Sequence, residues 1–288
     1  MTDATATVAR ARDEFLTLVE AVRPELHRYC ARLTGSVIEG EDIVQETLAK
    51  AFYALGLETE VPSLRPWLFR VAHNTAVDYL RSHGKRFTEA RDDLDEVAAF
   101  DDRPDPIVVR SALAQFVELP LTQRSAVILK DVLGHSLEET ADTMGTTVLA
   151  VKAALVRGRR NLRETSAAEG SPDLAVRARL DRYATLFNRR DWDGVRALIG
   201  DECQLDLVAK ARRRGKEVGA YFARYEKQNV SLSVVSLEGR LAFAAFVAGA
   251  QTASYFVLLD WDGDRVKSIR DYRYVPYIAA EATYETLG

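Results

Sequence analysis

The sequence predicts a multidomain protein in which two all-α domains are followed by an α+β domain. Apolar residues recur at helical spacing through residues 13–85, and a second helical pattern ends in a basic helix at residues 148–163. After residue 172 the pattern changes to short apolar or alternating runs separated by turn residues. The predicted boundaries are residues 1–87 for the first helical domain, 88–107 for a linker, 108–165 for the second helical domain, 166–172 for a short linker and 173–288 for the α+β domain.

The composition is that of a globular protein. Of the 288 residues, 47% are hydrophobic and 28% are charged, which suits two or three domains that each bury a core. Cys30 and Cys203 lie far apart and outside any paired motif, so neither a disulfide framework nor a metal site is supported. The N-terminus lacks an apolar signal segment, and the apolar stretch 241–259 is interrupted by polar residues. We therefore expect a cytoplasmic protein that contacts no membrane and needs no cofactor.

The first helical domain contains a helix with a polar ridge beside an apolar face. The apolar face is formed by Ile43, Val44, Leu48, Ala51 and Phe52. The polar ridge is formed by Asp42, Gln45, Glu46 and Lys50. A ridge of this kind suits a partner built of helices, and the alternative is a solvated helix surface.

The next helix of this domain carries a second polar face. It begins near residues 63–66 and ends at Gly84. Asn74 and Arg81 are seven residues apart with Asp78 between them, so the three side chains share one face. Such a face offers hydrogen bonds to a base edge and to a phosphate.

The second helical domain contains a helix-turn-helix pattern. Ser136 and Glu139 form a capping box, and Gly145 provides the turn to the following helix. That helix has an apolar side and a basic side, which predicts insertion into the DNA major groove. The alternative is a helical hairpin with a solvated basic face. The residues predicted to contact bases are Thr147, Lys152 and Arg157, and those predicted to contact phosphates are Arg159, Arg160 and Arg163.

Three segments, in this order, resemble the extracytoplasmic-function sigma factors of bacterial RNA polymerase. They are Asp42-Ile43-Val44-Gln45-Glu46-Thr47, then Pro66-Trp67-Leu68-Phe69-Arg70-Val71-Ala72-His73-Asn74 with Asp78-Tyr79-Leu80-Arg81, and then the helix-turn-helix. The resemblance implies that the polar ridge binds the core polymerase and that the helix-turn-helix reads the promoter −35 element. The residues implied to open and read the −10 element are Asn74, Asp78, Arg81 and Lys85.

The basic helix departs from the common family pattern Val-Lys-Ser-Arg-Leu. Ala153 and Ala154 replace its two polar residues, and Gly158 weakens a helix by about 1 kcal/mol relative to alanine. We therefore expect an unusual or weak −35 preference.

The linker is acidic and the net charge of the chain is −4. Residues 86–118 carry nine acidic side chains against four basic ones, whereas residues 119–164 carry five against seven. Positive charge is therefore local, and the free protein should bind DNA weakly. The linker is interpreted either as a solvated tether or as a polyanion that replaces nucleic acid in the polymerase channels, as the sigma resemblance implies.

The third domain is predicted to be an α+β cone with a curved antiparallel sheet. Helices near residues 173–188 and 217–227 precede four strand-like runs, and Gly239, Gly249 and Gly263 mark turns. The pattern resembles the SnoaL-like, NTF2-like superfamily, which includes isomerases and cyclases that use an aspartate or a histidine. This domain has no histidine. A pocket is predicted from Asp206, Tyr221, Tyr225, Tyr255, Asp271 and Tyr272, with core tyrosines and surface aspartates as the alternative.

Three functions are consistent with these patterns. The first is a promoter-specificity subunit whose partners are core RNA polymerase and promoter DNA, regulated by intramolecular contacts of a noncatalytic C-terminal domain or by an unknown small ligand. The second is a DNA-binding regulator that acts without polymerase, which leaves the polar ridge unexplained. The third is a SnoaL-type cyclase or isomerase with a DNA-binding appendage.

Overall fold

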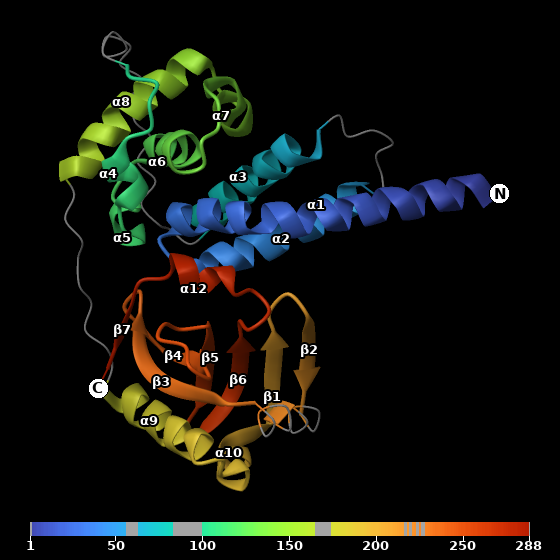
Figure 1. Cartoon of the computed structure of the whole chain (residues 1–288), viewed down its shortest axis with the longest axis vertical. Coiled ribbons are helices and arrows are strands. Elements are labelled where there is room, and N and C mark those ends of the chain that lie inside the picture. Colours follow the sequence, from blue (N-terminus) through green and yellow to red (C-terminus); the bar gives the residue numbers. More distant parts are fainter. Residues whose placement is uncertain are drawn as a thin grey trace. The chain divides into compact units, whose positions relative to one another are not determined.

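The computed structural model describes residues 2–55, 63–82, 100–164, 174–215, 218, 221–222, 225 and 228–287. The chain divides into two compact units, Met1–Ala168 and Glu169–Gly288, and Figure 1 labels the elements of each. The first unit is helical and the second combines helices with one sheet, which confirms the predicted order of fold classes. None of the described helices has the length and apolar character that a membrane span requires.

Helices of very different lengths build the first unit. In chain order they are α1 (Thr2–Thr34), α2 (Val37–Leu55), α3 (Leu64–Ser82), α4 (Pro106–Arg110), α5 (Leu113–Phe116), α6 (Leu121–Val127), the π-helical turn η2 (Ile128–Val132), α7 (Leu137–Met144) and α8 (Val148–Glu164). Helices α1 and α2 approach closely because Gly40 has no side chain: a Cβ atom there would lie 2.6 Å from the main-chain nitrogen of Ala31.

The two predicted helical domains share one hydrophobic core. Leu26 of α1 and Phe69 of α3 belong to the same buried cluster as Val127 of α6 and Leu155 of α8. The buried Arg124 guanidinium strengthens this junction, because it donates hydrogen bonds to the main-chain oxygens of residues 33, 117 and 119. Within the first unit, the helices on either side of the acidic linker are therefore packed together.

The second unit is a seven-stranded sheet with helices packed against it. Its elements are α9 (Leu174–Asn188), α10 (Trp192–Leu198), β1 (Ile199–Leu207), β2 (Ala211–Arg214), β3 (Val230–Leu237), β4 (Arg240–Val247), β5 (Tyr255–Asp262), β6 (Arg265–Asp271), α12 (Tyr277–Glu281) and β7 (Tyr284–Thr286). The strand order is β2-β1-β6-β5-β4-β3-β7. The four predicted runs are the antiparallel strands β3 to β6, and the predicted glycine turns lie between or beside them.

The sheet is mixed, which corrects the prediction of an antiparallel sheet. Strand β1 runs parallel to β6, with Leu205 opposite Ile269. Strands β2 to β5 lie between β1 and β6 in the sequence. The relative direction of two strands so far apart cannot be predicted from the periodicity within each strand.

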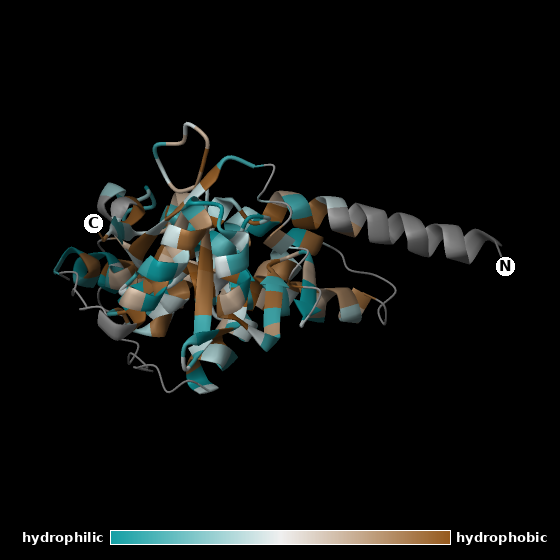
Figure 2. Cartoon of the chain, turned by 90° about the horizontal axis from the view of Figure 1, so that it is seen from below, coloured by the Kyte–Doolittle hydropathy of each residue, from teal (hydrophilic) through white to brown (hydrophobic). Residues whose placement is uncertain are grey.

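The core of the second unit lies between α9 and one face of the sheet. Leu180, Tyr183 and Phe187 of α9 are buried there, and the Tyr183 ring stacks on Phe243 of β4 with a centroid distance of 5.3 Å. Figure 2 shows hydrophobic and hydrophilic residues alternating along the ribbons, as expected for helices and strands with one buried face. The face of β1 and β6 opposite this core is polar.

Candidate nucleic-acid interface

The helix-turn-helix has the predicted capping and turn geometry. The Ser136 hydroxyl accepts a hydrogen bond from the Glu139 main-chain nitrogen at 3.0 Å, and the Glu139 carboxylate accepts one from the Ser136 nitrogen at 2.8 Å. These bonds lower the pKa of Glu139. Gly145 ends α7 in the left-handed region with φ 64°, a conformation that glycine adopts without strain. The Thr147 hydroxyl then accepts from the Ala150 nitrogen at 3.2 Å, which fixes the start of α8.

Helix α8 is more deeply packed than its sequence suggested. Val151, Leu155 and Leu162 are buried as expected, and Ala153 and Ala154 are buried as well. The two alanine side chains therefore point into the protein. In this arrangement a polar side chain at either position would not face solvent. Their burial does not test the expected weak −35 preference, which stays a prediction.

Gly158 is required by the crossing of α8 over α6. A Cβ atom at this position would lie 2.8 Å from Cγ1 of Val127 and 3.3 Å from the main-chain oxygen of Gln123. The low helix propensity of glycine is thus offset by a close approach of the two helices.

Arg159 is buried and bonded within the protein. Its guanidinium donates two hydrogen bonds to the Asp131 carboxylate, at 2.8 and 2.6 Å, and others to the main-chain oxygens of Asp101 and Arg103. Burial raises the pKa of Asp131, and the facing guanidinium opposes that rise. Arg157 is also buried, with 8% of its surface exposed. In this structure neither arginine faces solvent as a phosphate or base contact would.

The end of the acidic linker lies along the basic side of α8. The Lys152 ammonium is 5.5 Å from the centre of the Phe100 ring, and the Arg163 guanidinium pairs with Asp105. Asp102 pairs with Lys130 of η2 at 3.2 Å. The described acidic side chains thus neutralise part of the basic surface, while Thr147 and Arg160 remain exposed.

The polar ridge of α2 is at the surface, next to its predicted apolar face. Ile43 and Val44 are buried. The Lys50 ammonium pairs with the Glu46 carboxylate at 2.8 Å, with about half of each side chain exposed. Asp42 and Gln45 are half-buried. The ridge is therefore available to a partner from one side of the helix.

Two aromatic residues extend this surface toward the end of α2. Phe52 and Tyr53 are 49% and 72% exposed. Phe52 was predicted to belong to the apolar face, and the sequence pattern did not single out Tyr53. Aromatic residues are enriched in protein–protein interfaces, which have a polar rim.

Helix α3 brings three of its four predicted polar residues onto one exposed face. Asn74, Asp78 and Arg81 are all exposed, and Lys85 lies outside the described residues. Asn74 and Arg70 also line a cleft of about 320 Å³ with residues 141–146 of α7 and its turn. Sequence analysis did not identify Arg70, although it lies one helical turn before Asn74.

Comparisons with known proteins agree with this geometry. The chain matches Sigma-70 region 2 over residues 18–86 and Sigma-70, region 4 over residues 110–162. It is 30% identical over 156 residues to the RNA polymerase sigma factor CarQ of Myxococcus xanthus, covering 54% of this chain and 90% of CarQ. It is 33% identical over 216 residues to the ECF RNA polymerase sigma factor SigG of Mycobacterium tuberculosis, covering 63% of this chain. The chain belongs to the extracytoplasmic-function sigma factors.

This sigma factor spans 58% of the length of SigG. Among solved structures it is similar to the extracytoplasmic-function sigma factor SigJ of Mycobacterium tuberculosis, with a TM-score of 0.37 and 21% identity. That comparison covers 91% of this chain and 98% of SigJ.

The second unit of the sigma factor contains a buried polar cluster. The Asp271 carboxylate accepts hydrogen bonds from the hydroxyls of Tyr221 and Tyr225, at 2.7 and 3.0 Å, and from Nε of Arg273 at 2.8 Å. The Tyr255 hydroxyl donates to that of Tyr225 at 3.2 Å. Burial raises the pKa of all three tyrosines. Four of the six predicted pocket residues therefore meet, together with an arginine that sequence analysis missed.

The remaining two predicted pocket residues lie elsewhere. Asp206 is opposite Arg212 and Arg270 in the sheet, on the face turned away from Asp271, because alternate residues of a strand face opposite sides. Tyr272 is buried beneath the guanidinium of Arg270, 5.3 Å from the ring centre. The Asp271 cluster is a closed network in which both carboxylate oxygens accept hydrogen bonds, an arrangement poorly suited to proton abstraction.

Proposed function

We propose that this sigma factor binds bacterial core RNA polymerase and directs it to promoters in the cytoplasm. The observation that carries the proposal is the shared exposed face of Asn74, Asp78 and Arg81 within the segment that matches Sigma-70 region 2. An exposed amide beside a guanidinium offers hydrogen bonds to an unstacked base and to a phosphate. Lys85, which lies outside the described residues, is kept in this −10 surface as part of the proposal.

The −35 surface is proposed to centre on the start of α8 and its exposed cations. Thr147 stands at the N-terminus of the recognition helix, where base contacts are made in helix-turn-helix proteins. Lys152, Arg160 and Arg163 supply the positive charge. Arg157 and Arg159 are assigned a positioning role, because their guanidinium groups are buried. The polymerase surface combines the polar ridge with Phe52 and Tyr53.

The proposed domain boundaries are those of the sequence prediction. The C-terminal unit is proposed to be noncatalytic and to modulate promoter binding. The hydrogen-bond network around Asp271 supports this proposal, because both carboxylate oxygens already accept hydrogen bonds from the protein.

Run-off transcription with core polymerase on a promoter library tests the proposal. We expect the full-length wild-type protein to support transcription. Strand opening is measured as the permanganate reactivity of unpaired thymines, and we expect it to be lost in the double variant Asn74→Ala/Arg81→Ala. Arg182→Ala, which removes an exposed charge from α9, serves as a control. If core polymerase with the wild-type protein initiates at no promoter and does not associate with it, the proposal is wrong.

A further inference from the structure

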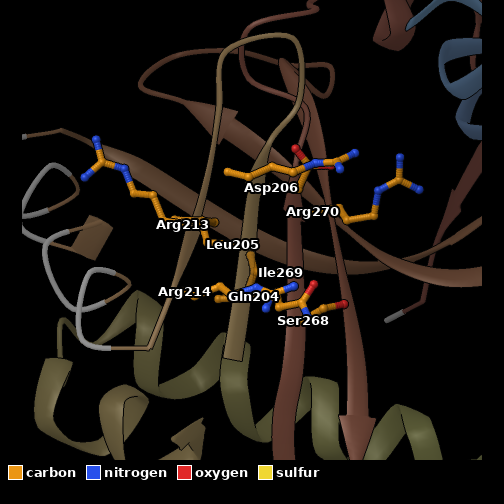
Figure 3. Close-up of a pocket in the computed structure, with 9 residues that line it drawn as sticks. Gln204, Leu205, Asp206, Arg213, Arg214, Ser268, Ile269 and Arg270 are labelled. Carbon is orange, nitrogen blue, oxygen red and sulfur yellow. The ribbon is translucent and has the colours of Figure 1, made fainter. Parts of the chain in front are cut away.

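An arginine-rich cleft lies on the outer face of the sheet in the second unit. Strands β2, β1 and β6 are neighbours there, with Asp206 opposite both Arg212 and Arg270, and Gln204 opposite both Arg214 and Ser268. Paired residues share a face of a sheet, so these side chains project from the side opposite the core. Figure 3 shows them as sticks around the cleft, which has a volume of about 600 Å³.

Positive charge exceeds negative charge along this cleft. Arg212, Arg214 and Arg270 lie on the outer face with one carboxylate among the lining residues, that of Asp206, whereas Arg213, which also lines the cleft, is paired with Leu205 on the alternate face of β2. The side chain of Arg212 is 82% exposed and approaches Asp206 only to 3.7 Å. The nearby Asp260 lies on the next strand and accepts a hydrogen bond from Ser268 at 2.6 Å. Such a surface attracts anions.

The shape and chemistry of the cleft favour a polyanion over a small metabolite. Small-molecule pockets are mostly apolar and enclose most of the ligand, whereas this cleft is lined by arginines, Gln204 and Ser268 on an open sheet face. Guanidinium groups donate paired hydrogen bonds to phosphate oxygens. Arg212 and Arg214 are two residues apart on β2, so their Cα atoms are about 7 Å apart. Arg270 is on β6, two strands from β2, at a distance of about 10 Å. That spacing matches several phosphates of one strand rather than a single anion.

We propose that the cleft of Arg212, Arg214 and Arg270 binds the phosphate backbone of promoter DNA. The proposal rests on the proposed function, because a promoter-bound sigma factor holds its C-terminal unit at a high local concentration of duplex DNA. Contacts to phosphates carry no sequence information. The cleft therefore adds affinity and salt dependence to promoter binding without changing which sequence is read.

The test compares two double variants of the full-length protein that lose the same charge. Arg212→Ala/Arg214→Ala removes the cleft arginines, and Arg182→Ala/Arg189→Ala removes two exposed arginines on and just after α9, which covers the opposite face of the sheet. Binding of a fluorescent promoter duplex is measured by anisotropy over a range of salt concentrations, both with core polymerase and with the protein alone.

We expect the cleft variant to bind the duplex roughly twofold to thirtyfold more weakly than the control variant. The slope of log K against log salt concentration should fall in magnitude by about 1.8, because about two phosphates are no longer neutralised by arginine. Asp206→Asn should have the opposite effect and strengthen binding, because it removes the carboxylate that competes with phosphate for Arg212.

Equal affinities and equal salt slopes for the two double variants would overturn the proposal. So would normal DNA binding combined with loss of core association in the cleft variant, since the cleft would then contact a protein. If the wild-type protein does not associate with core polymerase, the proposed function fails, and the comparison on protein alone still decides whether the cleft binds DNA.

Discussion

Nε of Arg70 in α3 donates a hydrogen bond to the main-chain oxygen of Asp142 in α7, at 3.1 Å. Nearby, the Phe69 ring lies 4.7 Å from that of His135. The surface proposed to read the −10 element is thereby joined to the helix-turn-helix proposed to read −35. These elements are centred 25 base pairs apart, about 85 Å at about 3.4 Å per base pair. If both elements are bound at the same time, we expect α3 and α7 to separate.

The first prediction concerns this separation. Arg70→Ala removes one hydrogen bond from the junction, which contributes about 1 kcal/mol, so the closed arrangement should lose about fivefold in relative population. The distance between spin labels on exposed positions of α3 and α7, measured by electron paramagnetic resonance, should shift toward longer values. Core polymerase should lengthen it further in the wild-type protein.

Arg182→Ala, in the second unit, is the control and should leave the distance distribution unchanged. A wild-type distribution that stays short when core polymerase and promoter are both bound would contradict the opening.

The second prediction separates a structural arginine from a surface one on the same helix. Arg159→Ala leaves the Asp131 carboxylate buried without its partner, and we expect a loss of about 3 kcal/mol in the free energy of unfolding. The neighbouring Arg160 is exposed, so Arg160→Ala should change stability by about 0.5 kcal/mol or less. Denaturant unfolding followed by circular dichroism measures both.

DNA binding gives the complementary result. Arg160→Ala should weaken −35 binding and reduce its salt dependence by about one phosphate contact. Unchanged stability of Arg159→Ala together with complete loss of DNA binding would return Arg159 to the phosphate-contacting role that the sequence suggested.

The sequence identified local features of the interface and missed features that depend on tertiary packing. The Ser136 capping box and the turn at Gly145 are specified within a few residues, and both were predicted. The role of Arg159 depends on Asp131 and on carbonyl groups more than 50 residues away, as in its bond to Asp101. Basic residues on a helix look alike in sequence whether they face DNA or a buried carboxylate.

The same distinction applies to the second unit. Strands β3 to β6 follow one another and were predicted from alternation and glycine turns. The parallel pairing of β1 with β6 joins distant segments, and it decides that Asp206 faces the arginine cleft while Asp271 faces the core. Period-2 alternation separates even from odd positions, but it does not say which of the two faces will be covered.

The third prediction concerns Gly158. In a solvent-exposed helix, glycine to alanine stabilises by about 1 kcal/mol. Here the added methyl group would meet Val127 at 2.8 Å, so Gly158→Ala should destabilise the first unit by about 1 to 3 kcal/mol. A double variant with Val127→Ala should recover part of the loss. Thermal unfolding measures the change, and a raised melting temperature for Gly158→Ala would contradict the close helix crossing.

The fourth prediction is a pH dependence that arises from His73. Its Nδ1 atom is 2.7 Å from the Tyr29 hydroxyl, and burial lowers its pKa to about 4. The unfolded chain has the ordinary value of about 6.5 and therefore binds a proton first as the pH falls. Stability contributed by neutral His73 is complete above pH 6.5 and is lost as the pH falls toward 4, by about 2 kcal/mol at pH 5.

The free energies of unfolding at pH 7 and pH 5 test this dependence. Both pH values are suitable because most carboxylates stay charged there. His135 has a lowered pKa of the same origin and contributes with the same sign, so the wild-type protein alone does not isolate His73. His73→Gln keeps a hydrogen-bonding group near Tyr29 and cannot titrate. Its loss of stability between the two pH values should therefore be about 2 kcal/mol smaller than that of the wild-type protein, and equal losses would mean that His73 is protonated or exposed in the folded chain.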